Sequence, residues 1–199
     1  VVLAESIADD EGDYERTYPE GSLAAHIIGY YSQQFGNAGL ENSANDTLTG
    51  NQDFGTWSSA IASLAGSTTV GNDVVLTINS TIQAKAEELL EGETGAIVVL
   101  DPTTGAVLAE ASSPTYDVND VTSYLSGEVA GDNLYNRATQ GLYPPGSSMK
   151  VVTLTARVTQ KFSCLTDTYE APASLTIGGG GVTNYENVDY GTITLQRGL

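Results

Sequence analysis

The clearest pattern of hydrophobic and polar positions lies between residues 74 and 92. Val74–Ile78 is a short run rich in β-branched residues, which predicts a strand. Ser80–Gln83 fits a capping box, in which the Ser hydroxyl and the Gln side chain satisfy free backbone N–H groups, and Gly92 suits a C-terminal stop. A helix is therefore predicted from Ser80, with one apolar face formed by Ile82, Ala86, Leu89 and Leu90.

A β-hairpin is predicted directly after this helix. Ala96–Leu100 is a continuous apolar run, and Ala106–Ala111 is a second strand candidate. Between them, Asp101–Gly105 reads Asp-Pro-Thr-Thr-Gly, which is strong turn chemistry. Beyond the hairpin, residues 112–135 are expected to form a loop with one short helix near Val121–Leu125.

A second helix is predicted from Ser147 to about Gln160. Pro144–Gly146 breaks the chain immediately before it. Four consecutive glycines, Gly178–Gly181, predict a loop or a hairpin tip, and a further element opens near Ile193. The apolar positions that indicate the helix are Met149, Val152, Leu154, Ala156 and Val158.

The first part of the chain is less regular. Residues 1–22 are polar and acidic, and we expect them to be an exposed arm or edge segment. Residues 23–31 form a short apolar run that should be buried. Residues 36–56 are rich in Gly, Asn, Asp and Thr, which predicts a loop.

A domain boundary is predicted at the linker Gly66–Asn72. It separates an N-terminal segment, residues 1–70, from a second domain, residues 71–199. Antiparallel strands combined with helices predict an α+β fold class. The abrupt start and end of the sequence lead us to expect that both are fragment boundaries.

The charge balance excludes several classes of function. The 199 residues carry 25 acidic residues against 7 Lys and Arg, a formal net charge of −18. Nucleic-acid and anionic-membrane surfaces need basic patches, so neither partner is expected, and the acidity favours solubility. With one cysteine and one histidine, the chain can form neither an internal disulfide nor a Cys/His metal cluster. No apolar run reaches the length of about 18 residues typical of a membrane-spanning helix.

Ser147 and Lys150 carry the candidate chemistry. Their Ser-x-x-Lys spacing places both side chains on one face of a helix, one turn apart. Free N–H groups at the helix N-terminus, including the backbone N–H of Ser147, would supply half of an oxyanion hole. The positive end of the helix dipole disfavours a second cation, which favours the neutral amine of Lys150. A neutral lysine can accept the serine proton, so the pair can form an activated nucleophile without histidine.

The bare spacing is also compatible with a structural role. Ser-x-x-Lys arises by chance about once in a chain of this length. Ser147 would then be an ordinary helix N-cap, and Lys150 a solvated lysine in the first turn. The sequence around the pair favours the catalytic interpretation.

That sequence resembles the class B penicillin-binding proteins, since Ser-x-x-Lys is a signature of penicillin-binding proteins. Residues 136–138 (Asn-Arg-Ala) and 143–150 (Tyr-Pro-Pro-Gly-Ser-Ser-Met-Lys) closely resemble their nucleophile region. Residues 95–105 and 111–117 are similar to the strand pair that opens their transpeptidase domain. Shorter similarities to their N-terminal pedestal, and to the run before their second motif, lie at Tyr18-Pro19, Leu23–His26, Gly29-Tyr30, Gly39–Glu41, Leu48–Gly50 and Tyr190–Leu195.

The resemblance implies a partial penicillin-binding transpeptidase domain, an antiparallel sheet with packed helices, preceded by a small pedestal segment of the dimerisation type. Ser147 would attack the D-Ala-D-Ala carbonyl of a peptidoglycan stem peptide with Lys150 as base, without cofactor or metal. β-Lactam antibiotics would acylate the same serine. The family is held on the extracytoplasmic face of the cell membrane by an N-terminal anchor, and its expected partners include proteins of the cell-division or elongation complex.

Two further motifs of the family are missing from the sequence. No Ser-x-Asn follows Ser147, and no Lys-Thr-Gly occurs, so little or no turnover is expected from this chain alone. Two other functions stay open. A non-catalytic pedestal or interaction module would expose an apolar patch on residues 1–70. A serine β-lactamase or β-lactam sensor shares Ser-x-x-Lys and would be distinguished by its rate of deacylation.

Several other residues are assigned structural roles. His26 lies in an apolar run and is expected to be a core or interface histidine. Arg137 is expected to support the structure through an ion pair, and Cys164 to be a buried residue or an inert free thiol. Asn184 is interpreted as a turn former, and Gly178–Gly181 lacks the strand–helix context of a phosphate-binding loop.

Overall fold

The computed structural model describes residues 1–8, 13–50 and 71–198, which fall into two units, Val1–Leu142 and Tyr143–Leu199. Most of the predicted linker Gly66–Asn72, and residues 9–12 of the acidic stretch 1–22, lie outside the described residues. Both units combine helices with antiparallel strands, so the predicted α+β class is confirmed.

The N-terminal segment begins with an antiparallel pair of strands, β1 (Glu5–Ala8) and β2 (Tyr14–Thr17), where an exposed arm or edge was expected. The apolar run 23–31 contains the short helix α1 (Ala25–Ile28). It is buried as predicted at Ala24, Ala25 and Ile28.

The loop predicted for residues 36–56 is wrong over residues 39–48, and its last part, residues 51–56, lies outside the described residues. Two short helices, α2 (Gly39–Ser43) and α3 (Asn45–Leu48), occupy it. A tertiary ion pair stabilises α2, because Arg16 donates to the buried carboxylate of Glu41 at 2.8 Å. Composition alone does not show such a contact, since its partners lie 25 residues apart.

A core cluster joins the N-terminal segment to the region after the hairpin. The hydroxyl of Tyr116 donates to the carbonyl of Ala25 at 3.0 Å. The amide of Asn119 makes hydrogen bonds with both the N–H and the C=O of Tyr18, at 3.2 and 2.9 Å. Burial raises the pKa of Tyr18 to about 12. The cluster consists of Tyr18, Ala24, Ala25, Ile28, Tyr116, Val118 and Val121.

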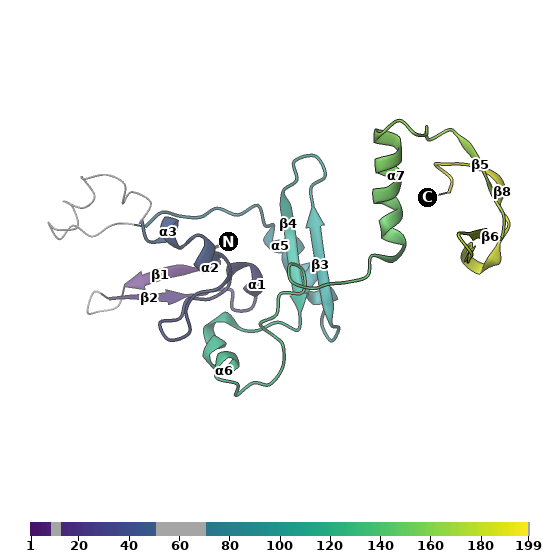
Figure 1. Ribbon diagram of the computed structural model, residues 1–199. Coiled ribbons are helices and arrows are strands. Elements are labelled where there is room, and N and C mark those ends of the chain that lie inside the picture. Colours follow the sequence, from purple (N-terminus) through teal and green to yellow (C-terminus); the bar gives the residue numbers. More distant parts are fainter. Residues whose placement is uncertain (9–12, 51–70, 199) are drawn as a thin grey trace. The chain divides into compact units, whose positions relative to one another are not determined.

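The predicted β-hairpin and its helix are confirmed. Strands β3 (Gly95–Leu100) and β4 (Val107–Ser113) pair antiparallel, and α5 (Ser80–Leu89) lies against them (Figure 1). In the turn, the carboxylate of Asp101 accepts from the N–H of Thr103 at 2.8 Å. A second core cluster forms where α5 meets the hairpin, from Ala86, Leu90, Ala109 and Ala111. The predicted short helix is also present, as α6 (Val121–Leu125), which follows the 3-10 turn η2 (Val118–Asp120).

Two local predictions before α5 are wrong. Val74–Ile78 is not a strand, and Val75 is 93% exposed. Near the end of the segment, the hydroxyl of Thr77 donates to the carbonyl of Val107 at 2.6 Å, and the N–H of the following Asn79 donates to the carbonyl of Leu108 at 2.8 Å. Asn79, and not Ser80, is the N-cap, because its side-chain oxygen accepts from the N–H groups of residues 81 and 82.

Gln83 was assigned to the capping box, but its side chain is fully buried and binds the neighbouring strand. Its amide nitrogen donates to the carbonyl of Glu110 at 2.9 Å, and its amide oxygen accepts from the N–H of Glu110 at 2.8 Å. The same nitrogen donates to the carboxylate of Glu87 at 2.7 Å. Gln83 therefore joins α5 to β4 through polar groups inside the core.

Replacing Gln83 with methionine is expected to lower the free energy of unfolding by about 3 kcal/mol, because the backbone N–H and C=O of Glu110 lose their partner away from water. Urea unfolding measures the change. Lys85→Met is the control, since it removes only an exposed ion pair with Glu88 from the same helix and should cost less than about 1 kcal/mol. Equal stability of the two variants would contradict the role given to Gln83.

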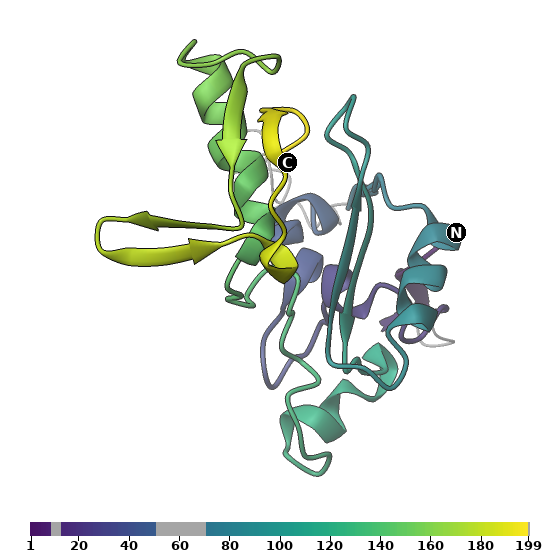
Figure 2. The same cartoon turned by 90° about the vertical axis from the view of Figure 1, so that its right-hand side faces the viewer.

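The second unit contains the helix predicted from Ser147. A 3-10 turn, η3 (Gly146–Ser148), leads into α7 (Met149–Thr159). The glycine run forms the tip of a hairpin, as predicted, between β6 (Ser174–Ile177) and β7 (Gly180–Thr183), which Figure 2 shows as a narrow ribbon. The remaining elements are β5 (Thr168–Ala171), η4 (Tyr185–Asn187) and β8 (Gly191–Thr194), with β5 and β8 paired antiparallel.

Polar side chains hold this unit together. Arg157, on α7, donates to the hydroxyl of Ser163 at 2.6 Å, and Ser163 also shares a hydrogen bond with the hydroxyl of Tyr169 at 2.7 Å. The side chain of Asn184 donates to three backbone carbonyls, which supports its assignment as a turn former. Cys164 is exposed, so the prediction of a buried cysteine is wrong, while a free thiol is confirmed.

Candidate active site

Ser147 occupies the middle of the 3-10 turn η3, directly before α7. Gly146 has φ +53, a conformation that glycine adopts without strain, and it turns the chain into the helix. The first intra-turn hydrogen bond runs from the N–H of Ser148 to the carbonyl of Pro145 at 3.2 Å. The N–H of Ser147 precedes it and has no acceptor inside the turn.

Lys150 is the second residue of α7, three positions after Ser147. Both side chains are exposed. Lys150 lines a cavity of about 520 Å³, and Ser147 is not among its lining residues. Together with Lys150 the lining contains Arg157 but no carboxylate; the other residues are Thr153, Leu154, Ala156, Gln160, Phe162, Leu195 and Gly198.

The helix α7 forms despite its β-branched residues. The hydroxyl of Thr153 donates to the carbonyl of Lys150 at 3.0 Å, and that of Thr155 to the carbonyl of Val151 at 2.7 Å. These hydrogen bonds satisfy polar side chains on the helix itself. The hydroxyls of Thr153 and Thr155 therefore need no partner outside the helix.

Most of the acidic residues of the chain lie in the first unit. Residues 1–142 contain 21 of the 25 acidic residues but only 3 of the 7 Lys and Arg, whereas residues 143–199 contain four of each. All three cations of the first unit pair with a carboxylate, Arg16 with Glu41, Lys85 with Glu88 and Arg137 with Asp132. The unit that carries Ser147 and Lys150 has no net charge.

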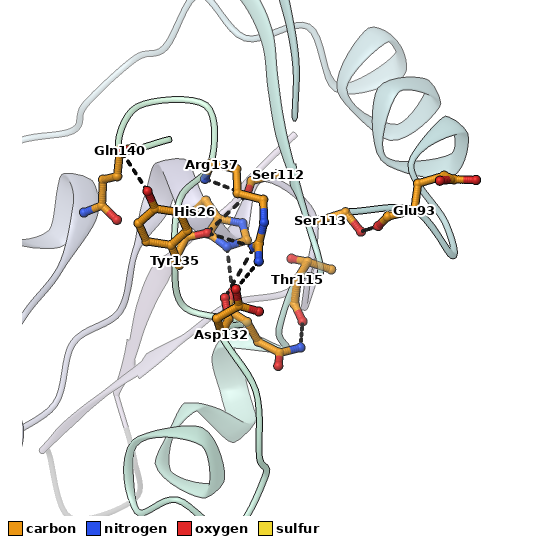
Figure 3. A network of polar contacts seen from close by, with 10 residues as sticks. His26, Glu93, Ser112, Ser113, Thr115, Asp132, Tyr135, Arg137 and Gln140 are labelled. Atoms are coloured by element: carbon orange, nitrogen blue, oxygen red, sulfur yellow. Dashed lines mark hydrogen bonds and ion pairs between the residues drawn. The ribbon is translucent and has the colours of Figure 1, made fainter. Parts of the chain in front are cut away.

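A polar network in the first unit surrounds the chain just before residues 138–146 (Figure 3). The guanidinium of Arg137 is buried and forms an ion pair with Asp132, which holds the pKa of that carboxyl below its usual value. The N–H of Arg137 donates to the hydroxyl of Ser112 at 2.9 Å. Arg137 also lies over the ring of Tyr135, 5.5 Å from its centroid. The structural role predicted for Arg137 is thus confirmed.

His26 packs into the same region. Its Nε2 lies 2.7 Å from the carbonyl of Asn133, and its ring meets Tyr116 edge-on at 5.2 Å between centroids. Burial lowers the pKa of His26, so the ring is neutral at pH 7 and Nε2 carries the donated proton. The prediction of a core or interface histidine is confirmed.

Sequence reasoning missed the partners of these residues. Ser112 lies 25 residues from Arg137, so no local motif links the two. Asp132 lies only five residues from Arg137, but that spacing forms no recognised motif. Among residues 1–8, 13–50 and 71–198, no group of three or more His, Cys, Asp or Glu side chains could hold a metal ion. No helix in the described part of the chain has the length and apolarity needed to cross a membrane.

Two protein families match the chain. The penicillin binding protein A dimerisation domain matches residues 1–74. The penicillin binding protein transpeptidase domain matches residues 95–199, which include Ser147 and Lys150. Residues 75–94, with the helix α5, lie between the two matches.

Curated relatives agree with these matches. The chain is 33% identical over 220 residues to the peptidoglycan D,D-transpeptidase PbpA of Mycobacterium tuberculosis, covering 98% of this chain and 44% of the relative. It is 35% identical over 171 residues to the peptidoglycan D,D-transpeptidase MrdA of Acinetobacter baumannii, covering 70% of this chain and 25% of the relative. The chain therefore spans less than half the length of these relatives.

Solved structures show the same likeness. The D,D-transpeptidase domain of a peptidoglycan glycosyltransferase from Eggerthella lenta has a TM-score of 0.79 and 40% identity, covering 99% of this chain and 44% of that one. A penicillin G acyl-enzyme complex of penicillin-binding protein A from M. tuberculosis has a TM-score of 0.77 and 30% identity, covering 98% and 49%. With the transpeptidase match extending over more than half of its residues, the chain belongs to the class B penicillin-binding proteins.

Proposed function

We propose that the chain is part of a D,D-transpeptidase that cross-links peptidoglycan stem peptides through an acyl group on Ser147. The observation that carries the proposal is the Ser-x-x-Lys pair at the start of α7, inside the matched transpeptidase region. Ser147 attacks the carbonyl between the two D-alanines of the stem peptide, and its proton passes to the side-chain nitrogen of Lys150. D-Alanine leaves, and an amine from a neighbouring stem peptide resolves the acyl-serine.

The geometry of η3 supports the role of Ser147. Its backbone N–H has no acceptor inside the turn, so it can donate to the oxygen that becomes negative during attack. Lys150 follows within one helical turn, close enough to serve as the base after side-chain rotation. Neither step requires a metal or a cofactor.

The proposal extends to the whole protein only by analogy with longer relatives, since the chain covers 44% of PbpA. We place the reaction on the extracytoplasmic face of the cell membrane, with β-lactams as substrate mimics and division or elongation proteins as partners. Turnover of stem peptides by residues 1–199 alone should be slow or absent, because no Ser-x-Asn follows Ser147 and no Lys-Thr-Gly occurs.

The test is the intact mass of the chain after incubation with benzylpenicillin. We expect one covalent adduct per chain, formed slowly and retained for hours after the free antibiotic is removed. An unmodified mass after prolonged incubation would contradict the proposal that Ser147 and Lys150 form an activated nucleophile here. Loss of the adduct within seconds would instead favour the β-lactamase alternative.

A non-catalytic interaction role for the N-terminal segment is the second candidate. It is favoured by the match of residues 1–74 to a dimerisation domain and by exposed apolar side chains, among them Ile7, Tyr14 and Phe35. Sedimentation velocity over a range of protein concentrations distinguishes it. Self-association that survives the loss of Ser147 would support this role, and a monomer at all concentrations would contradict it.

A further inference from the structure

A tight turn anchored by Asn136 precedes the nucleophile segment. The side-chain oxygen of Asn136 accepts from the N–H of Ala138 at 3.0 Å and from the N–H of Thr139 at 3.3 Å. The backbone carbonyl of Asn136 accepts from the N–H of Gln140 at 2.8 Å. The hydroxyl of Tyr135 donates to the backbone carbonyl of Gln140 at 2.7 Å. Residues 136–140 are therefore fixed from two sides.

The same Asn136 side chain binds the hairpin. Its amide nitrogen donates to the carboxylate of Glu110, on β4, at 2.9 Å. The backbone of Glu110 is held by the buried Gln83, and Gln83 shares the carboxylate of Glu87 with the N–H of Ala24 at 2.8 Å. A continuous series of hydrogen bonds thus runs from the N-terminal segment through α5 and β4 to the turn at 136–140.

Beyond this turn the chain is less constrained. Gly141 to Pro144 make no hydrogen bond to any residue that the structure describes, and Leu142 is 97% exposed. The next backbone hydrogen bond involves the carbonyl of Pro145, in the turn that carries Ser147. The hydrogen bond of Asn136 to Glu110 and that of the Arg137 N–H to the hydroxyl of Ser112 are therefore the last contacts with side chains of the hairpin before Ser147.

We propose that Asn136 is a positioning residue, which, through its hydrogen bond to Glu110, orders the chain that leads into Ser147. The inference rests on the proposed role of Ser147 as nucleophile. An asparagine suits this position because one end of its amide accepts from the turn while the other donates to a carboxylate. Aspartate has nearly the same shape but offers no donor. Asn136→Asp therefore removes the hydrogen bond to Glu110 and keeps the hydrogen bonds within the turn.

The test exchanges the donor and the acceptor of the hydrogen bond between residues 136 and 110. Asn136→Asp keeps the acceptor for Ala138 and Thr139 but sets two carboxylates at hydrogen-bond distance, which is repulsive. Glu110→Gln keeps an acceptor for Asn136 and serves as the control. In the double variant Glu110→Gln with Asn136→Asp, the new glutamine can donate to the new aspartate, which restores a bond of opposite direction.

Backbone hydrogen exchange at the hydrogen-bonded amides of residues 138–140 and 148–149 is the first readout, because it does not depend on activity. We expect exchange about tenfold faster in Asn136→Asp, unchanged within about twofold in Glu110→Gln, and restored in the double variant, with exchange in α5 unaffected. Faster exchange confined to residues 138–140, or a failure of the double variant to restore it, would overturn the inference.

The rate of acylation by a fluorescent penicillin is the second readout. A positioning role predicts that the rate constant of the covalent step falls about tenfold in Asn136→Asp, while the dissociation constant of the non-covalent complex is unchanged. A lower thermal midpoint with an unchanged covalent step would contradict positioning and indicate a merely structural contact. If the parent chain is not acylated at all, the proposed function fails, and hydrogen exchange still decides the role of Asn136.

Discussion

Replacing Ser147 with alanine should abolish the benzylpenicillin adduct completely. The hydroxyl oxygen of Ser147 is the atom proposed to form the acyl bond, and alanine leaves no nucleophile in its place. The substitution removes one exposed oxygen from a 3-10 turn whose recorded hydrogen bonds do not involve that oxygen, so the fold should be unchanged. Intact mass spectrometry after incubation with the antibiotic measures the effect, with circular dichroism to confirm folding.

Ser148 provides a matched control, since it is the neighbouring serine in the same turn. Its hydroxyl donates to the carbonyl of Pro145. Ser148→Ala should therefore lower stability slightly and leave acylation within about threefold of the parent chain. An adduct on Ser147→Ala, or its loss from Ser148→Ala alone, would mean that the nucleophile is assigned to the wrong residue.

The elements that the sequence predicts well are those determined by local chemistry. The turn Asp101–Gly105 sets the hairpin because the carboxylate of Asp101 binds its own backbone two residues later. The break at Pro144–Gly146 also acts locally: Gly146, at φ +53, turns the chain into η3 and α7. In both cases the controlling contact lies within a few residues of the signal, so a local pattern is sufficient.

The predictions that fail are those in which tertiary contacts decide. Val74–Ile78 has strand composition but pairs with β4 only near its end, and β propensity without a regular ladder does not make a strand. Gln83 matched a capping pattern, yet Asn79 caps the helix and Gln83 binds Glu110 instead. Several partners could satisfy the same amide, and only the folded chain shows which one does.

The candidate site likewise combines residues that a local pattern predicts with a contact that only the tertiary fold creates. Ser147 and Lys150 are three residues apart, so their shared turn of helix follows from the sequence, and resemblance to a known family gives them roles. Asn136 and Glu110 are 26 residues apart, and nothing in their surroundings links them before the hairpin is formed. The residues proposed to perform the chemistry could thus be named from the sequence, whereas the contact proposed to position them could not.

Replacing Lys150 with arginine should slow acylation by about a thousandfold. Arginine has much of the length of lysine, but its guanidinium stays protonated at any pH at which the protein is folded, so it cannot accept the proton of Ser147. The loss should fall on the covalent step and not on the binding of the antibiotic, because the substitution removes the proton acceptor and leaves Ser147 and its turn unchanged. Stopped-flow measurements with a fluorescent penicillin separate the two steps.

Lys161→Arg is the control for Lys150→Arg, since Lys161 is an exposed lysine in the same unit, beyond the end of α7. It should acylate within about twofold of the parent chain, because it keeps the charge and plays no part in proton transfer. Raising the pH should not rescue Lys150→Arg, whereas a merely electrostatic role for Lys150 would be met by arginine at every pH. A rate for Lys150→Arg within about tenfold of the parent chain would therefore show that another group accepts the proton of Ser147.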